Sequence, residues 1–348
     1  MALQQRQQGG DNSTNFQAEV VHFHQSGVSI ADPRGIAQDV YKANALEMAG
    51  LARSVAAERC EEWSEKFLMK LSKVSPALLA ALMDPDIQHS LFSAQRDFAR
   101  SGDDQLGDAL ADLLVLRCRT EPNSFTKVVL NEAIATLPKL THAQVDILSL
   151  IWTLTRTYEP TVTEPAHLST LWSRVIGPLL TDIPTSRSHI EHLSYAGCLT
   201  IGISGTSIWH LAMRTYGQLF SQGVSEEVIP GLLTNFWNDE RVFKPCQRDS
   251  SLKRAAQEAE IFVEGTVLTD NEEYELRKLR DGNYLQQSEF VNEMSTGFPA
   301  IQNLCDVWDK SAMSAADLST VGIAIAHSNA RRFGGPEDDS PLEEWLKV

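Results

Sequence analysis

The residues best suited to chemistry in this chain are two histidines and a cysteine near its middle. His189 and His192 are three positions apart, so on a helix both imidazoles would share one face, and Cys198 follows. Imidazole nitrogen and thiolate sulfur are ligands that zinc accepts. The segment lacks the H-E-x-x-H spacing that joins two metal ligands to a catalytic base, so hydrogen-bonded packing histidines are the simpler interpretation. We keep His189, His192 and Cys198 as metal candidates only, and expect neither a metal nor a cofactor.

Three other patterns that could do chemistry have ordinary structural explanations. His22 and His24 alternate along a predicted strand and would share one face, but no further ligand is visible near them. The Gly-Ile-Ser-Gly sequence at 202–205 resembles a tight turn, without the lysine and the strand-to-helix context of a phosphate-binding loop. The glutamates between residues 58 and 65 fit a solvated helix face. Because no G-x-S-x-G motif and no local nucleophile signature occurs, we name no catalytic residue.

A long helix is the element around which we expect the chain to be organised. Residues 36–74 contain no proline, and small or apolar residues recur there at steps of three and four, which is one helical face. The residues of this face are Ala45, Ala49, Ala52, Ala56, Cys60, Trp63, Phe67, Leu71 and Val74. Alanines allow a partner backbone to come close, whereas aromatic rings need a thick core. The first half of the helix is therefore predicted to lie against another helix, and the second half to enter a globular body.

A short β-forming arm is predicted before this helix. Residues 1–14 are polar and are predicted to be disordered, while residues 15–23 read NFQAEVVHF and alternate like one or two short strands with a bulge. An isolated strand is not stable in water, so it must pair within the chain or with another chain. The predicted oligomer interface combines this arm with the alanines of the helix: Phe16, Val20, Val21, Phe23, Ala45, Ala49, Ala52 and Ala56.

The expected fold class is mostly α, in five segments. They are an arm (1–35), the long helix (36–75), a helical bundle (76–158), a mixed and mainly helical middle region (159–250) and a C-terminal helical module (251–348).

The last two segments carry more specific expectations. Prolines interrupt the middle region, where residues 198–205 could form a strand, a loop or a buried irregular segment. The C-terminal module is expected to begin with a helix on Leu252, Ala256, Ala259 and Val263. The order of helix, short helix, helix and β-like turn that follows resembles a winged helix. Asp306 and Asp309 on its third helix would repel phosphates, so this module would contact protein rather than DNA.

Composition and charge limit the classes of partner. The formal net charge of −16 would repel nucleic acids and anionic membranes, so we expect neither as a partner. The five cysteines are scattered without a C-x-x-C pair, which favours a reducing compartment. The N-terminus has no apolar signal segment, and the uncharged run 195–213 is too rich in glycine and hydroxyl residues for a bilayer span. The expected location is the cytoplasm.

Four stretches of sequence carry a resemblance to known proteins. GGDNSTNFQAE, PRGIAQDVYKANALEMAG, MDPDIQHSLFSAQRDFARSGDDQLGDALADLL and the closing LSTVGIAIAHSNARR resemble an uncharacterised family of bacterial proteins, over most of the chain. The middle block and the closing L-x-T-x-G phrase are also similar to alpha-helical abortive-infection proteins of bacteria, although those end in Thr-Pro-Leu-Gly where this chain has Thr-Val-Gly. The resemblance implies a cytoplasmic bacterial protein with a role in anti-phage defence, and it brings no catalytic residues.

These observations favour a non-enzymatic, homo-oligomeric interaction protein whose C-terminal module recruits a protein partner. Two alternatives stay open. The first is an effector enzyme, a nuclease or nucleotide hydrolase, whose site is dispersed in the sequence and collects His189, His192 and carboxylates. The second is a membrane-acting protein that exposes residues 195–213 after a trigger.

Overall fold

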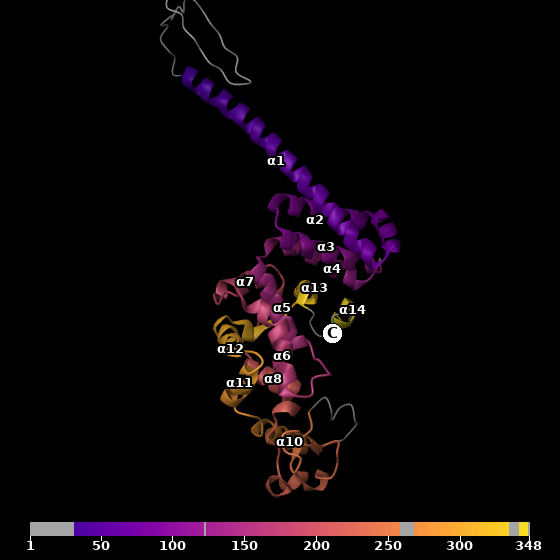
Figure 1. Cartoon of the computed structure of the whole chain (residues 1–348), viewed down its shortest axis with the longest axis vertical. Coiled ribbons are helices and arrows are strands. Elements are labelled where there is room, and N and C mark those ends of the chain that lie inside the picture. The colour runs from indigo at the N-terminus through magenta and orange to yellow at the C-terminus, as the bar shows by residue number, and fades with distance from the viewer. Residues whose placement is uncertain (1–30, 122, 258–267, 334–340, 347–348) are drawn as a thin grey trace, which may run out of the picture. The chain divides into compact units, whose positions relative to one another are not determined.

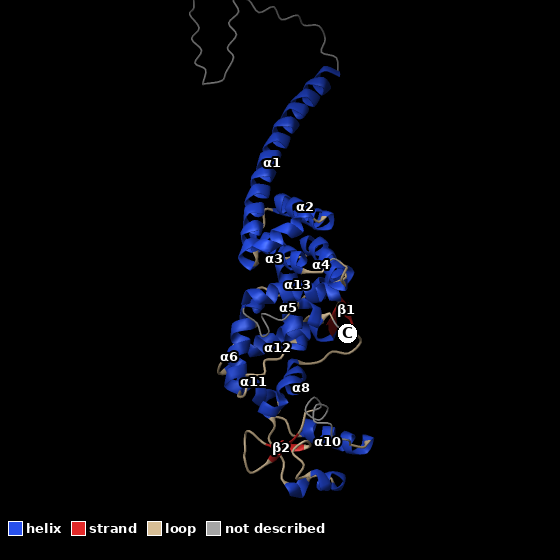
Figure 2. Ribbon diagram, turned by 90° about the vertical axis from the view of Figure 1, so that its right-hand side faces the viewer, coloured by secondary structure: helices blue, strands red, loops and turns tan. Residues whose placement is uncertain are grey.

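Helices form most of the part of the chain that the structure describes, and its strands make two short pairs, so the mostly α fold class is confirmed (Figure 2). By its internal contacts the chain divides into two units, residues 1–56 and 57–348. The computed structural model describes residues 31–121, 123–257, 268–333 and 341–346. The predicted strand of the arm lies outside the described residues, with His22, His24, Phe16, Val20, Val21 and Phe23.

The predicted long helix is present as α1 (Ala31–Val74), shown in indigo in Figure 1. It begins five residues earlier than the predicted start at residue 36, so the end of the predicted arm is helical. In the unit of residues 1–56, Ala45, Ala49 and Ala52 are exposed and Ala56 is half-buried. Within this unit α1 is the one element that the structure describes, so its expected helical partner stays a prediction.

In the unit of residues 57–348, the end of α1 packs on a helical bundle. The helices of this bundle are α2 (Pro85–Ser101), α3 (Asp104–Arg119), α4 (Phe125–Thr136) and α5 (His142–Arg156), with a 3-10 helix at Pro76–Met83. Trp63 and Phe67 are buried, and the Trp63 indole Nε1 donates a hydrogen bond to the carbonyl of Gly107 on α3 at 2.8 Å. A Cβ at Gly107 would lie 2.7 Å from the Phe98 ring and 3.2 Å from Cδ1 of Trp63, so a glycine lets both rings pack against α3.

Local capping sets where these helices begin. The side chains of Asp84, Asp103 and Ser124 accept hydrogen bonds from backbone amides in the first turns of α2, α3 and α4. Thr141 and Gln144 form a capping box at the start of α5.

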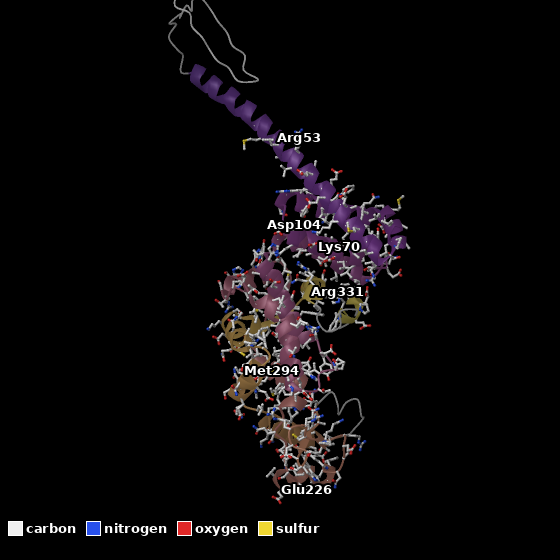
Figure 3. The ribbon with its side chains drawn as sticks, in the orientation of Figure 1. Arg53, Lys70, Asp104, Glu226, Met294 and Arg331 are labelled. Atoms are coloured by element: carbon white, nitrogen blue, oxygen red, sulfur yellow. The ribbon has the colours of Figure 1, made fainter. Side chains whose placement is uncertain are left out.

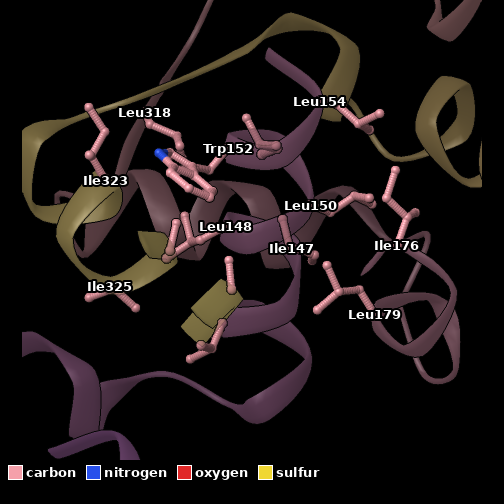
Figure 4. Close-up of a cluster of buried hydrophobic side chains, with 14 of the residues drawn as sticks. Ile147, Leu148, Leu150, Trp152, Leu154, Ile176, Leu179, Leu318, Ile323 and Ile325 are labelled. Atoms are coloured by element: carbon pink, nitrogen blue, oxygen red, sulfur yellow. The ribbon is translucent and has the colours of Figure 1, made fainter. Parts of the chain in front are cut away.

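Helices from the middle and the C-terminal part of the chain share one core with this bundle. They are α6 (Pro165–Val175), α7 (Arg187–Tyr195), α8 (Ile208–Phe220), α11 (Gln287–Ser295), α12 (Ile301–Lys310), α13 (Thr320–Ala330) and α14 (Leu342–Trp345), with a 3-10 helix at Gly177–Leu180. Figure 4 shows Leu148 and Trp152 of α5 close to Ile323 of α13. Each residue from Val321 to Ala330 is buried, so α13 is a central helix of the core.

The arrangement of β4 and α13 corrects the winged-helix interpretation. The sequence did not decide between a strand, a loop and an irregular segment for residues 198–205. Within them, residues 199–201 form strand β1 (Leu199–Ile201), which pairs antiparallel with β4 (Ala316–Leu318). A wing would be a hairpin following the third helix, but β4 pairs with a strand from the middle of the chain. It then leads directly into α13, which packs against α5 and α4. The C-terminal part is thus interleaved with the bundle.

A second, smaller core lies in the same unit. Val224, Leu233, Val242, Phe243, Ala255 and Leu276 form it, beside α10 (Asp270–Gly282) and the antiparallel pair β2 (Phe243–Pro245) and β3 (Lys253–Ala255). The helix expected from Leu252 is therefore wrong at residues 253–255, which form a strand. Strand pairing explains the difference, because residues 253–255 pair antiparallel with residues 243–245. The Lys253 Nζ also donates to the Trp237 carbonyl at 2.6 Å and lies over the Trp237 ring. Ala259 and Val263 lie outside the described residues.

None of the helices in the described stretches combines the length and the apolar composition needed to cross a bilayer. The uncharged run 195–213 is divided among the end of α7, β1 and the start of α8, and Cys198, Leu199 and Ile208 within it are buried.

Candidate functional site

The three metal candidates have structural roles. A buried glutamine, Gln144, holds both histidines: its Nε2 donates to the His189 carbonyl at 3.1 Å and lies 2.9 Å from Nδ1 of His192. Cys198 is buried, and burial raises the pKa of its thiol to about 11. Within the described part of the chain, these residues do not join a group that could hold a metal ion.

The closing Leu-Ser-Thr-Val-Gly phrase joins α13 to this same region. The Ser319 amide donates to the Cys198 carbonyl at 3.0 Å, and its hydroxyl donates to the Gly197 carbonyl at 2.6 Å. Ser319 also caps α13 by accepting a hydrogen bond from the amide of Gly322. A Cβ at Gly322 would overlap the Cys198 carbonyl oxygen. The phrase therefore has a packing role, as a serine cap followed by a glycine where two backbones meet.

Sequence reasoning missed a buried polar network at the other end of α13. Asn329 is buried, and its Nδ2 donates to Oδ1 of Asp146 at 3.1 Å and to Oγ of Ser149 at 2.9 Å. Nη1 of Arg332 lies 3.4 Å from Oδ1 of Asn329. The signal in the sequence was His327-Ser-Asn, three polar residues in an otherwise apolar helix, since buried polar groups need partners.

This network opens into a cleft of about 410 Å³. Its polar lining includes Asp103, His142, Asp146, Asp182 and Arg332. Nε2 of His142 lies 2.6 Å from Oδ2 of Asp103, and burial raises the pKa of the Asp146 carboxyl. A carboxyl with a raised pKa can hold and donate a proton closer to neutral pH, so Asp146 could assist proton transfer to a ligand in this cleft. It contains neither His189 nor His192.

The clearest surface feature is an apolar face on α1, which we call the α1 face. It consists of Ala45, Met48, Ala49, Leu51, Ala52, Val55 and Ala56. Met48 is 69% exposed, Leu51 63% and Val55 44%, although each is large and apolar. At 100° per residue these positions share one side of the helix, and Gly50 and Ser54 lie on the other. Arg53, labelled in Figure 3, is the one charged residue in the sequence between Met48 and Ala57.

Comparison with known protein families places the chain in one of them. A family model matches residues 27–346, and its description names no activity. The chain belongs to this uncharacterised family, in agreement with the resemblance of the sequence over most of its length. No curated protein and no solved structure matches the chain significantly.

Proposed function

We propose that this protein works by self-association, as a homo-oligomeric interaction protein, and that the α1 face is a contact between copies. The observation that carries the proposal is the exposure of the large apolar side chains of Met48, Leu51 and Val55 on one side of α1. Contiguous apolar surface of this kind is typical of interaction sites. A second copy is the occupant we infer, because the face is complementary to itself.

The self-complementarity follows from the alternation of large and small residues. Ala45, Met48, Ala52 and Val55 follow steps of three, four and three, the spacing of a helix–helix seam. In an antiparallel pair centred at the level of Gly50, Met48 of one copy faces Ala52 of the other, and Val55 faces Ala45. Each large side chain thus meets an alanine, and a two-fold axis produces both contacts. The seam contains no charged residue that would face its own copy.

The expected strength is modest. Burying the exposed parts of Met48, Leu51 and Val55 contributes about 1–2 kcal/mol each, or roughly 6–12 kcal/mol over two copies. Association costs about 4–15 kcal/mol in lost translational and rotational freedom, so the seam alone supports a weak dimer that forms with rising concentration.

Cysteine cross-linking tests both the contact and its direction. In a Cys60→Ser background, mixing the Met48→Cys protein with the Ala52→Cys protein should give a covalent dimer under mild oxidation. Gly50→Cys is the matched control, because it lies at the same level of α1 on the other side, where a Cβ meets nothing within 4 Å. Cross-linking of Gly50→Cys with equal efficiency would contradict the proposal.

The location and biological role are part of the same proposal. The resemblance to abortive-infection proteins supports a bacterial cytoplasmic protein in anti-phage defence that recruits a protein partner through residues 251–348. Bacteria expressing the wild type should resist phage in a plating assay, and Met48→Glu, which places a charge in the seam, should remove that resistance at equal protein level. If bacteria with Met48→Glu resist phage as well as those with the wild type, self-association through the α1 face is not needed for defence.

The Asp146 cleft favours a second candidate, an effector enzyme acting on nucleotides or nucleic acids. Its test is turnover of these substrates by the purified protein, with Asp146→Asn as the inactive control. Turnover that Asp146→Asn leaves unchanged would exclude the cleft as the site.

A further inference from the structure

A small cavity lies in the core where α5, α6 and α8 meet. Its volume is about 10 Å³, which is close to the ~10–15 Å³ that one water molecule needs. The cavity is far too small for a nucleotide, and it shares no lining residue with the Asp146 cleft. The residues that line it include Thr153, Thr157, Thr215, Leu171, Trp172 and Val175.

Thr153 differs from the other hydroxyl residues along this part of the chain. Each of the others donates to the carbonyl four residues earlier: Ser149 to Val145 at 3.0 Å, Thr155 to Ile151 at 2.7 Å and Thr157 to Thr153 at 2.7 Å. The Thr153 side chain is 7% exposed, and its Oγ1 makes no hydrogen bond within the described part of the chain. Because a buried hydroxyl without a partner is costly, this atom indicates a ligand in the cavity.

Two further hydroxyls line the same cavity. Thr157 donates its proton to the Thr153 carbonyl, and its oxygen still has lone pairs that can accept a hydrogen bond. Thr215 comes from α8, so the hydroxyls around the cavity belong to two different parts of the core. A buried water typically makes about three hydrogen bonds. Three hydroxyls around a space of this size therefore match what a buried water needs.

The path of α8 gives a second, independent observation at this cavity. The helix contains a non-helical residue, Tyr216, with φ −126° and ψ 24°, and this residue also lines the cavity. Helices bend sharply at only a few kinds of place, and one of them is where a water enters the ladder of backbone hydrogen bonds. The interruption of α8 and the unpaired hydroxyl of Thr153 thus meet at the same point.

We propose that this cavity binds one structural water, which bridges Thr153 and Thr157 to Thr215 and so links α5 to α8. A sodium ion has a similar size, but the residues that line the cavity, all of them described, include no carboxylate. Its charge would therefore be buried without compensation. An apolar occupant would leave the Thr153 hydroxyl without a partner.

A high-resolution crystal structure of the full chain tests the occupant directly. Electron density for one water should lie in the cavity, about 2.7–2.8 Å from Oγ1 of Thr153 and within hydrogen-bond distance of the other two hydroxyls. An ordered cavity without this density would overturn the proposal. So would a Thr153 hydroxyl that turns back to donate to the Ser149 carbonyl.

Urea unfolding of Thr153→Val tests the site in solution, because valine replaces the hydroxyl with a methyl group and keeps the shape. Losing a hydroxyl that holds a water should raise the unfolding equilibrium constant about fivefold, as expected for one hydrogen bond. Thr155→Val is the matched control, because its hydroxyl donates within α5 and does not line the cavity. It should stay within about twofold of the wild type. A Thr153→Val protein at least as stable as the wild type, or affected no more than Thr155→Val, would overturn the proposal.

A double-mutant cycle tests the bridge between the two helices. The Thr153→Val, Thr215→Val double variant should lose less stability than the sum of the two single losses, because both hydroxyls hold the same water. Since Oγ1 of Thr153 has no hydrogen bond to any described residue, a direct bond between the two hydroxyls does not explain such coupling. Additive losses would overturn the bridge.

Discussion

Replacing Asp86 with asparagine should destabilise the helical bundle strongly, because it removes the charged partner of a buried arginine. Arg117 on α3 is 1% exposed, and its Nη2 donates to Oδ2 of Asp86 at 2.6 Å. Asn131 donates to the same oxygen at 3.0 Å, and the Lys127 ammonium lies 3.3 Å from it. Hydrogen bonds from Asn131 and Arg117 lower the pKa of Asp86 to about 2.

The magnitude follows from the asymmetry of burial. Removing one partner of a buried ion pair costs roughly 3–5 kcal/mol, since the other charge stays in the core. The Asp86 side chain is 37% exposed, so water reaches one side of the pair and we expect the lower end, about 3 kcal/mol, for Asp86→Asn. Arg117→Met instead leaves a carboxylate that water and Lys127 still stabilise, so its loss should be about 1 kcal/mol.

A double-mutant cycle measures this coupling. Urea unfolding followed by far-ultraviolet circular dichroism at pH 7 gives the free energy of unfolding of each variant. The Asp86→Asn, Arg117→Met double variant should be about as stable as Arg117→Met alone, which is a coupling of about 2–3 kcal/mol. Additive losses, or a loss under about 0.5 kcal/mol for Asp86→Asn, would refute the reasoning.

The same carboxylate sets a pH dependence. A pKa lowered in the folded state contributes stability above the unfolded value of 3.8, and that contribution is lost as the pH falls toward about 2. Asp86→Asn should therefore flatten the acid side of the stability profile, and a wild-type profile that stays flat over that range would contradict the assignment.

Three further outcomes are expected in urea unfolding. Burial raises the pKa of Asp146 above its ordinary value of 3.8, so the folded state loses stability as the pH rises from that value through the raised pKa. The stability of Asp146→Asn relative to the wild type should therefore increase as the pH rises above 3.8. Gly322→Ala should cost at least about 3 kcal/mol, because its Cβ meets the rigid Cys198 carbonyl. Gly107→Ala should cost less, about 1–2 kcal/mol, because the Phe98 ring can move. An Asp146→Asn variant whose stability depends on pH as the wild type's does would contradict the burial of Asp146. A larger loss of stability for Gly107→Ala than for Gly322→Ala would contradict the two glycine contacts.

Features set by local sequence were predictable. The long helix follows from a step of three and four held without a proline, and the capping boxes at Thr141 and Thr269 follow from a spacing of three residues. In both cases the partners are near in the sequence, so periodicity and capping rules apply directly.

Features set by distant partners were not predictable. Residues 253–255 have a helix-compatible spacing, but pairing with residues 243–245 makes them a strand. Asn329 and Asp146 are 183 positions apart, and nothing local indicates that they meet. The sequence assigned the apolar stretch of α13 to a separate C-terminal module. Its burial depends on α5 and α4, which are distant in the sequence, so its place in the shared core could not be predicted. The candidate clefts belong to this second class.

Sedimentation equilibrium of the purified full chain over a concentration series tests the central claim most directly. The wild type should show a mass that rises from monomer toward dimer through the micromolar range, and Met48→Glu should stay monomeric. Ser54→Glu, which places the same charge on the other side of α1, should associate like the wild type. A wild type that stays monomeric at the highest concentration, or an equal effect of the two glutamates, would contradict the account.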